Sequence, residues 1–286
     1  MTGSRKTQRK QRRKGRALLF AGTTDMFPDV RYRTGFTAPD PVVYLEKAPR
    51  RALVVSRLEY GRAVAAAAAS EVYTPEMLKL CGNERRDLGH WALAVARKLR
   101  ARRVRVPPAF PVGVARVLEA GGIGVDVAQE PIYPERAVKR RDELASIRMS
   151  QQAAVIAMRA AISRLAQAEP HLDGTLRYEG KRLESEHLHA LIDTVLLEHG
   201  CVARDTIVAG GRQAADPHEH GSGPLRRGEP IVIDIFPQHK QHGYWGDLTR
   251  TVARGPVAPE VERLYQAVRA AQRAALAQVR PRVKCA

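Results

Sequence analysis

The sequence predicts an α/β layer domain followed by an α+β unit built around a β-ribbon. In the first half of the chain, short β-branched runs alternate with helical stretches, which is typical of α/β layers. Prolines and charges then cluster at 131–139, which indicates a domain boundary. Beyond it, long amphipathic stretches precede apolar β-rich runs. A chain of 286 residues is long enough to bury a core in each part.

The elements of the first part follow from local composition. Strands are expected at 16–20, 42–45, 52–56, 104–106 and 123–127, and helices at 57–69, 88–101 and 112–119. No glycine-rich phosphate loop precedes any of these helices. Nucleotide binding therefore has no support in this part of the chain.

Three helices are expected in the second part. The first begins near Asp142 and ends at Glu169, because a residue before proline avoids the helical region. Its apolar stripe, predicted to face the core, is Leu144, Ile147, Val155, Met158, Ile162 and Leu165. The second helix runs from about Leu183 to a stop at Gly200, and the last follows Pro256 and Pro259.

Charge is concentrated at the amino terminus. The formal net charge is +18, and residues 1–16 carry eight Lys or Arg and no acid. One interpretation of residues 1–15 is a nucleic-acid arm, and the other is a basic, disordered, solvated tail. No aromatic residue is interleaved with these charges, which argues against specific single-strand binding. We expect only weak, nonspecific and salt-sensitive association with nucleic acid.

The remaining composition bears on the compartment. No apolar run is long enough to span a bilayer, and no apolar segment of the signal-peptide type follows the basic terminus. Cys81, Cys201 and Cys285 lack metal-type spacing and imply no pairing, which suits a reducing environment. These features predict a cytoplasmic protein without a membrane partner.

The chemistry-bearing stretch is the β-rich segment 230–251. An apolar, β-branched run delivers Asp234, a polar loop follows, and Asp247 opens a second β-rich run. Two antiparallel strands would direct both carboxylates towards one point. Paired carboxylates repel each other unless a cation lies between them, and oxygen ligands suit hard divalent ions. The alternative is that both aspartates are turn and strand-end residues that face water.

Three segments carry a family resemblance. Asp247-Leu248-Thr249-Arg250-Thr251 matches an Asp-x-Thr-Arg-Thr ligand motif, and the segment 209–218 ends in Pro217-His218. Tyr32-Arg33-Thr34-Gly35-Phe36 is similar to a Tyr-Leu-Thr-Gly-Phe element. The chain thus resembles the metallopeptidase family that holds Xaa-Pro aminopeptidase, prolidase, creatinase and methionine aminopeptidase. The resemblance implies an α/β creatinase-like N-terminal domain at 16–136 and a partial α+β pita-bread domain, its first half, at 137–286.

The same resemblance implies a site. Asp234 and Asp247 would bind a divalent metal pair of manganese, cobalt or zinc, with Asp247 as the bridge. His218 would orient or protonate the substrate, and Thr249 would support Asp247. The substrate would be a peptide with proline near its N-terminus, and a homodimer is an expected assembly. His220, His239 and His242 are expected to be solvent-facing loop residues.

The sequence also departs from the family pattern. The family site has five ligands, and no histidine or aspartate follows Asp247 in this chain. Glu260 and Glu262 are two apart at a helix start, so they point to different faces. The aspartates are thirteen residues apart, two more than expected, and Phe236 stands where glycine is usual.

These departures lead to two hypotheses. In the first, the chain is a shortened or split peptidase that is inactive alone, because three ligands are missing. In the second, it is a non-catalytic member of the family that binds peptides or partner proteins.

Overall fold

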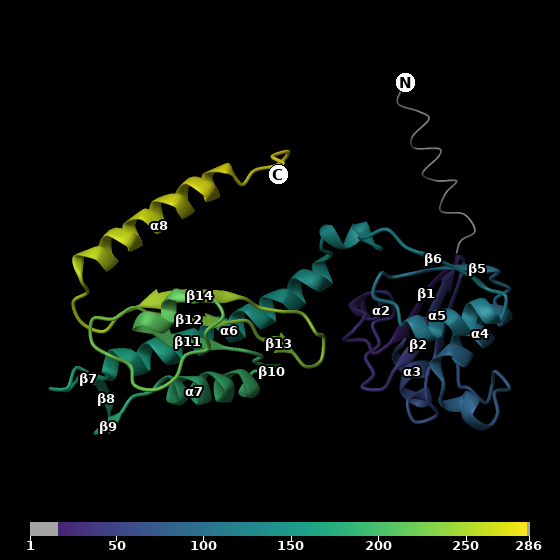
Figure 1. Ribbon diagram of the computed structural model, residues 1–286, viewed down its shortest axis with the longest axis horizontal. Helices are drawn as coiled ribbons and strands as arrows, with labels where there is room; N and C mark the ends of the chain where they lie inside the picture. Colours follow the sequence, from purple (N-terminus) through teal and green to yellow (C-terminus); the bar gives the residue numbers. More distant parts are fainter. Residues whose placement is uncertain (1–16, 285–286) are drawn as a thin grey trace. The chain divides into compact units, whose positions relative to one another are not determined.

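The computed structural model describes residues 17–284, and the chain divides between Val138 and Lys139 into two compact units (Figure 1). The basic tail predicted at 1–15 lies outside the described residues. No helix within 17–284 combines the length and apolar character needed to cross a membrane.

The first unit is built on a six-stranded sheet in the order β4-β3-β2-β1-β5-β6. Its strands are β1 (Ala17–Gly22), β2 (Val42–Lys47), β3 (Arg50–Val54), β4 (Glu71–Tyr73), β5 (Arg103–Val106) and β6 (Gly124–Val127). The pairs β1–β2 and β2–β3 are antiparallel, and the other three pairs are parallel. The five strands predicted here are confirmed, whereas β4 was not predicted.

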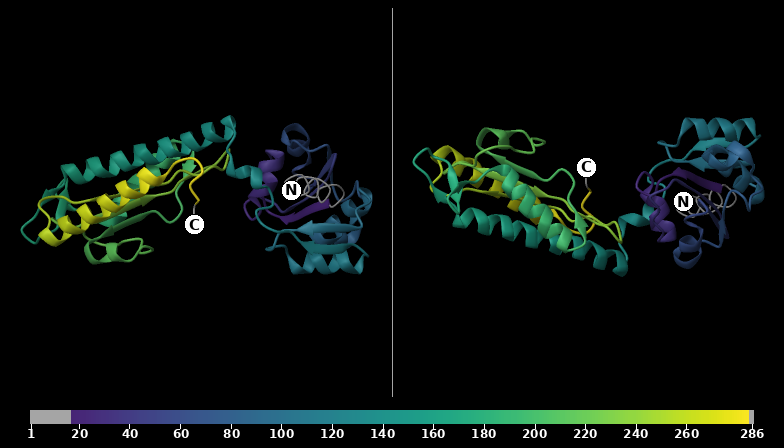
Figure 2. Two further views of the ribbon diagram at one scale, coloured as in Figure 1. Left: turned by 90° about the horizontal axis from the view of Figure 1, so that it is seen from above. Right: turned by 90° about the horizontal axis from the view of Figure 1, so that it is seen from below.

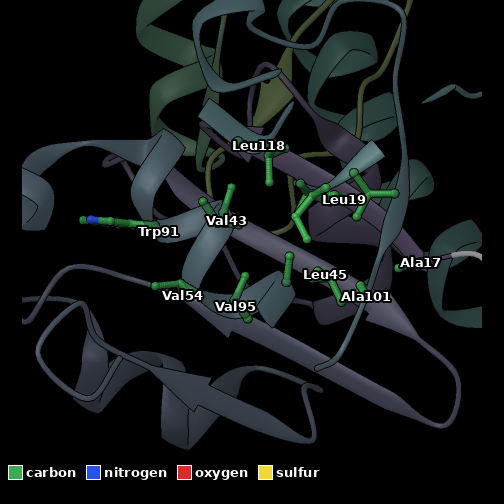
Figure 3. Close-up of a cluster of buried hydrophobic side chains, with 14 of the residues drawn as sticks. Ala17, Leu19, Val43, Leu45, Val54, Trp91, Val95, Ala101 and Leu118 are labelled. Carbon is green, nitrogen blue, oxygen red and sulfur yellow. The ribbon is translucent and has the colours of Figure 1, made fainter. Parts of the chain in front are cut away.

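Helices cover both faces of this sheet. They are α2 (Pro28–Thr34), α3 (Tyr60–Ala66), α4 (Leu88–Lys98) and α5 (Val112–Ala120), with short 3-10 turns η1 (Gly82–Arg86) and η2 (Pro134–Ala137). On one face Leu19, Val43 and Leu45 pack with Trp91 and Leu118 (Figure 3). The opposite face forms a second core, which includes Phe20, Tyr44 and Leu53. Burial on both faces explains why β1 and β2 are continuous apolar runs rather than alternating ones.

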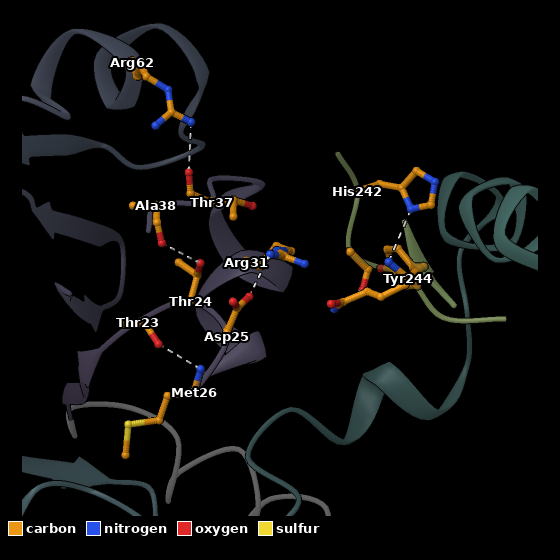
Figure 4. A network of polar contacts seen from close by, with 12 residues as sticks. Thr23, Thr24, Asp25, Met26, Arg31, Thr37, Ala38, Arg62, His242 and Tyr244 are labelled. Carbon is orange, nitrogen blue, oxygen red and sulfur yellow. Dashed lines mark hydrogen bonds and ion pairs between the residues drawn. The ribbon is translucent and has the colours of Figure 1, made fainter. Parts of the chain in front are cut away.

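Side-chain hydrogen bonds hold the loops around α2 and α3. The Thr23 hydroxyl accepts from the Met26 amide at 3.1 Å, and the Thr24 hydroxyl donates to the Ala38 carbonyl at 3.3 Å (Figure 4). Arg62 donates to the Thr37 carbonyl at 3.1 Å. The Thr24–Ala38 bond is buried, so it satisfies polar groups that packing would otherwise leave without water.

Glu46 on β2 is a carboxylate whose partners all come from the first unit. It forms a two-pronged ion pair with Arg33 and accepts hydrogen bonds from the hydroxyls of Tyr133 (2.9 Å) and Tyr44 (3.2 Å). Burial by itself would raise the pKa of Glu46, but the hydrogen bonds from Arg33 and Tyr133 outweigh it and lower that pKa. Arg33 occupies the leucine position of the predicted Tyr-Leu-Thr-Gly-Phe element, and this ion pair is its structural role.

The second unit combines long helices with small antiparallel sheets. Its helices are α6 (Arg141–Gln167), α7 (Ser185–Glu198) and α8 (Pro259–Gln278), with the turn η3 (Gly211–Ala215). The main sheet has the order β11-β12-β14, from β11 (Ile207–Gly210), β12 (Ile231–Ile235) and β14 (Leu248–Val252). The smaller sheets are β10 (Cys201–Val202) with β13 (Gln238–His239), and β7 (Glu169–Pro170), β8 (Leu176–Tyr178) and β9 (Lys181–Arg182).

Helices α6 and α7 cover one face of the main sheet, and α6 runs along the length of this unit (Figures 1 and 2). The prediction for the buried face of α6 was wrong at Leu144, which is 41% exposed. The buried face of α6 consists mainly of small or polar side chains. Its residues are Glu143, Ser150, Ala153, Ala154, Ala157, Met158, Ala161 and Leu165. Small side chains let the sheet approach the helix closely. The predicted last helix is present as α8, and no described residue of it is buried.

Candidate metal-binding site on the β12–β14 ribbon

Alternation along β12 sets the direction of Asp234. Ile231, Ile233 and Ile235 are fully buried against α6 and α7, so the residues between them face the other side of the sheet. Asp234 is therefore half-buried on the face away from these helices. β-branched isoleucine at every second position both favours the strand and fixes its register.

The antiparallel pairing of β12 and β14 brings the second aspartate to the same face. Asp234 lies directly opposite Thr249. Asp247 precedes Thr249 by two residues, and alternate residues of an extended segment share a face. Asp247 lies just before β14, so this alternation predicts its carboxylate on the same side of the ribbon as Asp234.

The two aspartates have different surroundings. The Thr249 hydroxyl donates a hydrogen bond to Oδ1 of Asp234, whereas Thr249 had been expected to support Asp247. The Asp247 side chain is exposed, and within residues 17–284 no donor or ion-pair partner contacts its carboxylate. Asp234 is thus oriented by a neighbour, and Asp247 presents its oxygens to solvent.

The backbone of Asp247 is held from α6. The Gln151 side-chain carbonyl accepts from the Asp247 amide at 3.0 Å, and the Gln151 amide group donates to the Asp247 carbonyl at 3.0 Å. Gly246 is buried beside them, and its own amide donates to the Pro237 carbonyl at 2.9 Å. The ends of the loop between the two aspartates are therefore joined to each other and to the helix.

The loop is also fixed at its middle. The Tyr244 hydroxyl donates to Glu143 at 2.7 Å, and Ser150 donates to the Tyr244 carbonyl at 2.8 Å. Burial and the adjacent Glu143 carboxylate raise the pKa of Tyr244 to about 12. The His239 and His242 rings stack with centroids 3.8 Å apart, and His242 Nδ1 accepts from the Tyr244 amide (Figure 4). The expectation that His239 faces solvent was wrong, because it is 9% exposed in this stack.

His218 lies apart from the ribbon contacts. It follows η3 in the exposed loop between β11 and β12, and its backbone amide donates to Asp216 at 3.0 Å. Within the described residues no hydrogen bond connects His218 to Asp234 or Asp247. The structure therefore joins Asp234 to Thr249 through a hydrogen bond, whereas His218 lies on the separate β11–β12 loop.

The described residues fit a metal ion only in part. Two carboxylates on one face suit a hard divalent cation, since such ions prefer oxygen ligands. Within residues 17–284, however, no group of three or more His, Cys, Asp or Glu side chains is arranged to hold a metal. The ribbon supplies a pair of ligands and not a closed coordination sphere.

The sequence reasoning missed the contribution of α6 to this site. Glu143 and Ser150 are seven residues apart, about two helical turns, so they lie on the same face as the buried alanines. A pair of polar residues on a helix face of otherwise small, apolar residues is the signal that could have shown that α6 binds the loop between the two aspartates. Gln151 carries no such signal, because it lies at the margin of that face.

The arrangement defines a class of protein. A six-stranded α/β domain followed by a helix-backed antiparallel ribbon with paired aspartates is a creatinase-like N-terminal domain with part of a pita-bread domain. Residues 145–286 match the family model described as "Metallopeptidase family M24". The chain belongs to this metallopeptidase family.

Solved structures support the fold. The prolidase from Pyrococcus horikoshii is 21% identical with a TM-score of 0.72, over 93% of this chain and 68% of that chain. The Xaa-Pro dipeptidase from Bacillus anthracis is 16% identical with a TM-score of 0.73, over 90% of this chain and 65% of that chain. At these identities the likeness concerns the fold.

Sequence relatives cover shorter segments. The Xaa-Pro dipeptidase of Lactobacillus delbrueckii subsp. lactis is 36% identical over 78 residues, which is 27% of this chain and 21% of the relative. The Xaa-Pro dipeptidase of Pyrococcus furiosus is 28% identical over 149 residues, 51% of this chain and 38% of the relative. The matches thus span well under half of the length of these relatives.

Proposed function

We propose that the second unit supplies the paired-aspartate part of a divalent-metal site that hydrolyses the N-terminal bond of peptides with proline near that end. The observation that supports the proposal is the register that places Asp234 opposite Thr249, because Asp247 precedes Thr249 by two residues. The names of the relatives, which include Xaa-Pro dipeptidases, support the substrate class. Manganese, cobalt and zinc are the metals proposed.

Each residue has a proposed role. Asp234 and Asp247 would hold the metal pair, with Asp247 as the bridging ligand, and Thr249 would keep the Asp234 carboxylate oriented. When bound, the metal would polarise the scissile carbonyl and lower the pKa of water. His218 would contact the substrate from the β11–β12 loop and donate or orient a proton.

The chain alone is expected to be inactive. Two carboxylates leave most of a coordination sphere to water, and a dinuclear site needs more anionic ligands. The test is incubation of the purified chain with an Xaa-Pro dipeptide and Mn²⁺, with Asp247→Asn as the matched control. No turnover is expected from either protein. Turnover by the wild-type chain that stops on chelation and is absent in Asp247→Asn would contradict this expectation.

A second candidate function is non-catalytic binding of peptides or partner proteins. It is favoured by the absence of a three-ligand metal group within the described residues. Calorimetry separates the two candidates. Heat from an Xaa-Pro dipeptide without any heat from Mn²⁺ or Co²⁺ would favour the binding function, and Mn²⁺ binding that requires Asp234 and Asp247 would favour the metal site.

A further inference from the structure

Helix α6 contacts Asp247 through two hydrogen bonds that a single side chain makes to the backbone of one residue. Gln151 uses both ends of its amide, one accepting from the Asp247 N–H and one donating to the Asp247 carbonyl, each at 3.0 Å. This pair of bonds fixes the plane of both peptide groups that flank the Asp247 Cα. The direction of the Cα–Cβ bond is thereby set by a helix that is 96 residues away in sequence.

Gly246 makes this contact sterically possible. A Cβ at position 246 would lie 2.5 Å from the Ser150 carbonyl oxygen and 2.9 Å from the Gln151 amide nitrogen. Both are backbone atoms of α6, so they cannot move aside as the end of a flexible side chain could. A larger residue at 246 would push the ribbon away from the helix and stretch both Gln151 hydrogen bonds.

The two Gln151 hydrogen bonds matter because no side chain supports the Asp247 carboxylate directly. Asp234 is oriented by Thr249, but no described residue donates to the Asp247 carboxylate. Control of its backbone is therefore the means by which the fold directs it. Preorganised ligands bind metal more tightly than ligands that must be ordered on binding.

We infer that Gln151 is a positioning residue that orients the Asp247 carboxylate towards the proposed metal site. Gly246 allows the ribbon to approach α6 closely enough for Gln151 to form its hydrogen bonds. The inference rests on the proposed ligand role of Asp247. It assigns to α6 a function in the site that its predicted core stripe did not indicate. Gln151 itself does not touch the metal or the substrate.

The test compares adjacent glutamines in the full chain. Gln151→Met keeps the side-chain length and removes both hydrogen bonds, and Gln152→Met is the matched control, since Gln152 is exposed. The first measurement is Mn²⁺ affinity from the electron paramagnetic resonance signal of free Mn²⁺. We expect affinity to fall about tenfold in Gln151→Met, the scale typical of lost outer-shell support, and to be unchanged in Gln152→Met.

Amide hydrogen exchange is the second measurement. The Asp247 amide should exchange at least several-fold faster in Gln151→Met, and Gln151→Glu should restore slow exchange because it keeps the acceptor. Ile192→Val, a core change in α7, serves as the control for general destabilisation. It should lower the thermal midpoint without changing Mn²⁺ affinity, which separates positioning from a merely structural role.

The outcomes separate the inference from the proposed function. If wild type binds Mn²⁺ and Gln151→Met binds it equally well, the inference is overturned and the ligand pair survives. If wild type binds no Mn²⁺, or Asp247→Asn binds as tightly as wild type, the proposed function fails and the positioning role falls with it. A loss of affinity in Ile192→Val equal to that in Gln151→Met would also overturn the inference.

Discussion

The two units differ in how many hydrogen-bond partners they give to their carboxylates. Glu46 in the first unit has partners from Arg33, Tyr44 and Tyr133, so its oxygens are saturated inside the fold. On the ribbon of the second unit, Asp234 has one hydroxyl partner and Asp247 presents exposed oxygens. A saturated carboxylate stabilises the protein and has little capacity left for a ligand. An undersaturated pair contributes little to stability and retains the capacity to bind.

The largest expected effect is at Glu46. Glu46→Gln removes the charge that compensates the partly buried Arg33, so we expect the free energy of unfolding of the first unit to fall by about 3 kcal/mol. Urea denaturation measures this loss. Glu119→Gln, an exposed change on α5, is the control and should have little effect. A Glu46→Gln loss no larger than that of the control would remove the contrast between the two units.

The pH dependence of the first unit should follow from the same residue. The pKa of Glu46 is below its ordinary value of 4.5 in the folded state, so the folded protein holds the carboxylate more strongly than the unfolded chain does. This contribution is fully present above about pH 4.5 and is lost as the pH falls towards the folded pKa. Denaturation between pH 6 and pH 3 should therefore show a shallower loss of stability in Glu46→Gln than in wild type.

A smaller loss of stability is expected where Tyr244 joins the loop to α6 in the second unit. Tyr244→Phe leaves Glu143, which is 4% exposed, without its hydroxyl partner, at an expected cost of about 1–2 kcal/mol. Tyr265→Phe on exposed α8 is the control. Thermal unfolding by circular dichroism measures both variants, and equal midpoints would show that the loop is not held through Glu143.

The smallest effect should be at the candidate ligand itself. Asp247→Asn changes an exposed side chain without a described partner, so stability should change by less than about 0.5 kcal/mol. If unfolding experiments instead show a loss comparable to that of Glu46→Gln, Asp247 is a structural carboxylate. The carboxylates of the ribbon would then stabilise the fold as Glu46 does, and the contrast between the two units would not hold.

Local sequence was informative where local chemistry decides the structure. The isoleucines of β12 and the β-branched run of β14 indicated the ribbon, because alternation and β-propensity act within a few residues. The same is true of the five strands predicted in the first unit. Short β4, with half-buried residues and no alternation, offered no comparable signal.

The missed features depend on contacts between distant segments. Leu144 was assigned to the core because a large apolar side chain dominates a periodicity pattern, whereas the sheet packs against alanines of α6. The bonds from Glu143 and Gln151 to the loop join residues 101 and 96 positions apart. No pattern within a helix reveals which loop it will meet, and so neither the buried His239 stack nor the Gln151 contact was predictable.

The lack of space at Gly246 also constrains how this loop can vary during evolution. Residues can be added or lost at the turn 240–242, because turns between strands generally tolerate insertion. The segment that begins at Gly246 cannot shift in register, because the helix backbone fills the place of a side chain there. Homologous chains should therefore differ in the length of the connection and keep the last glycine before the second aspartate.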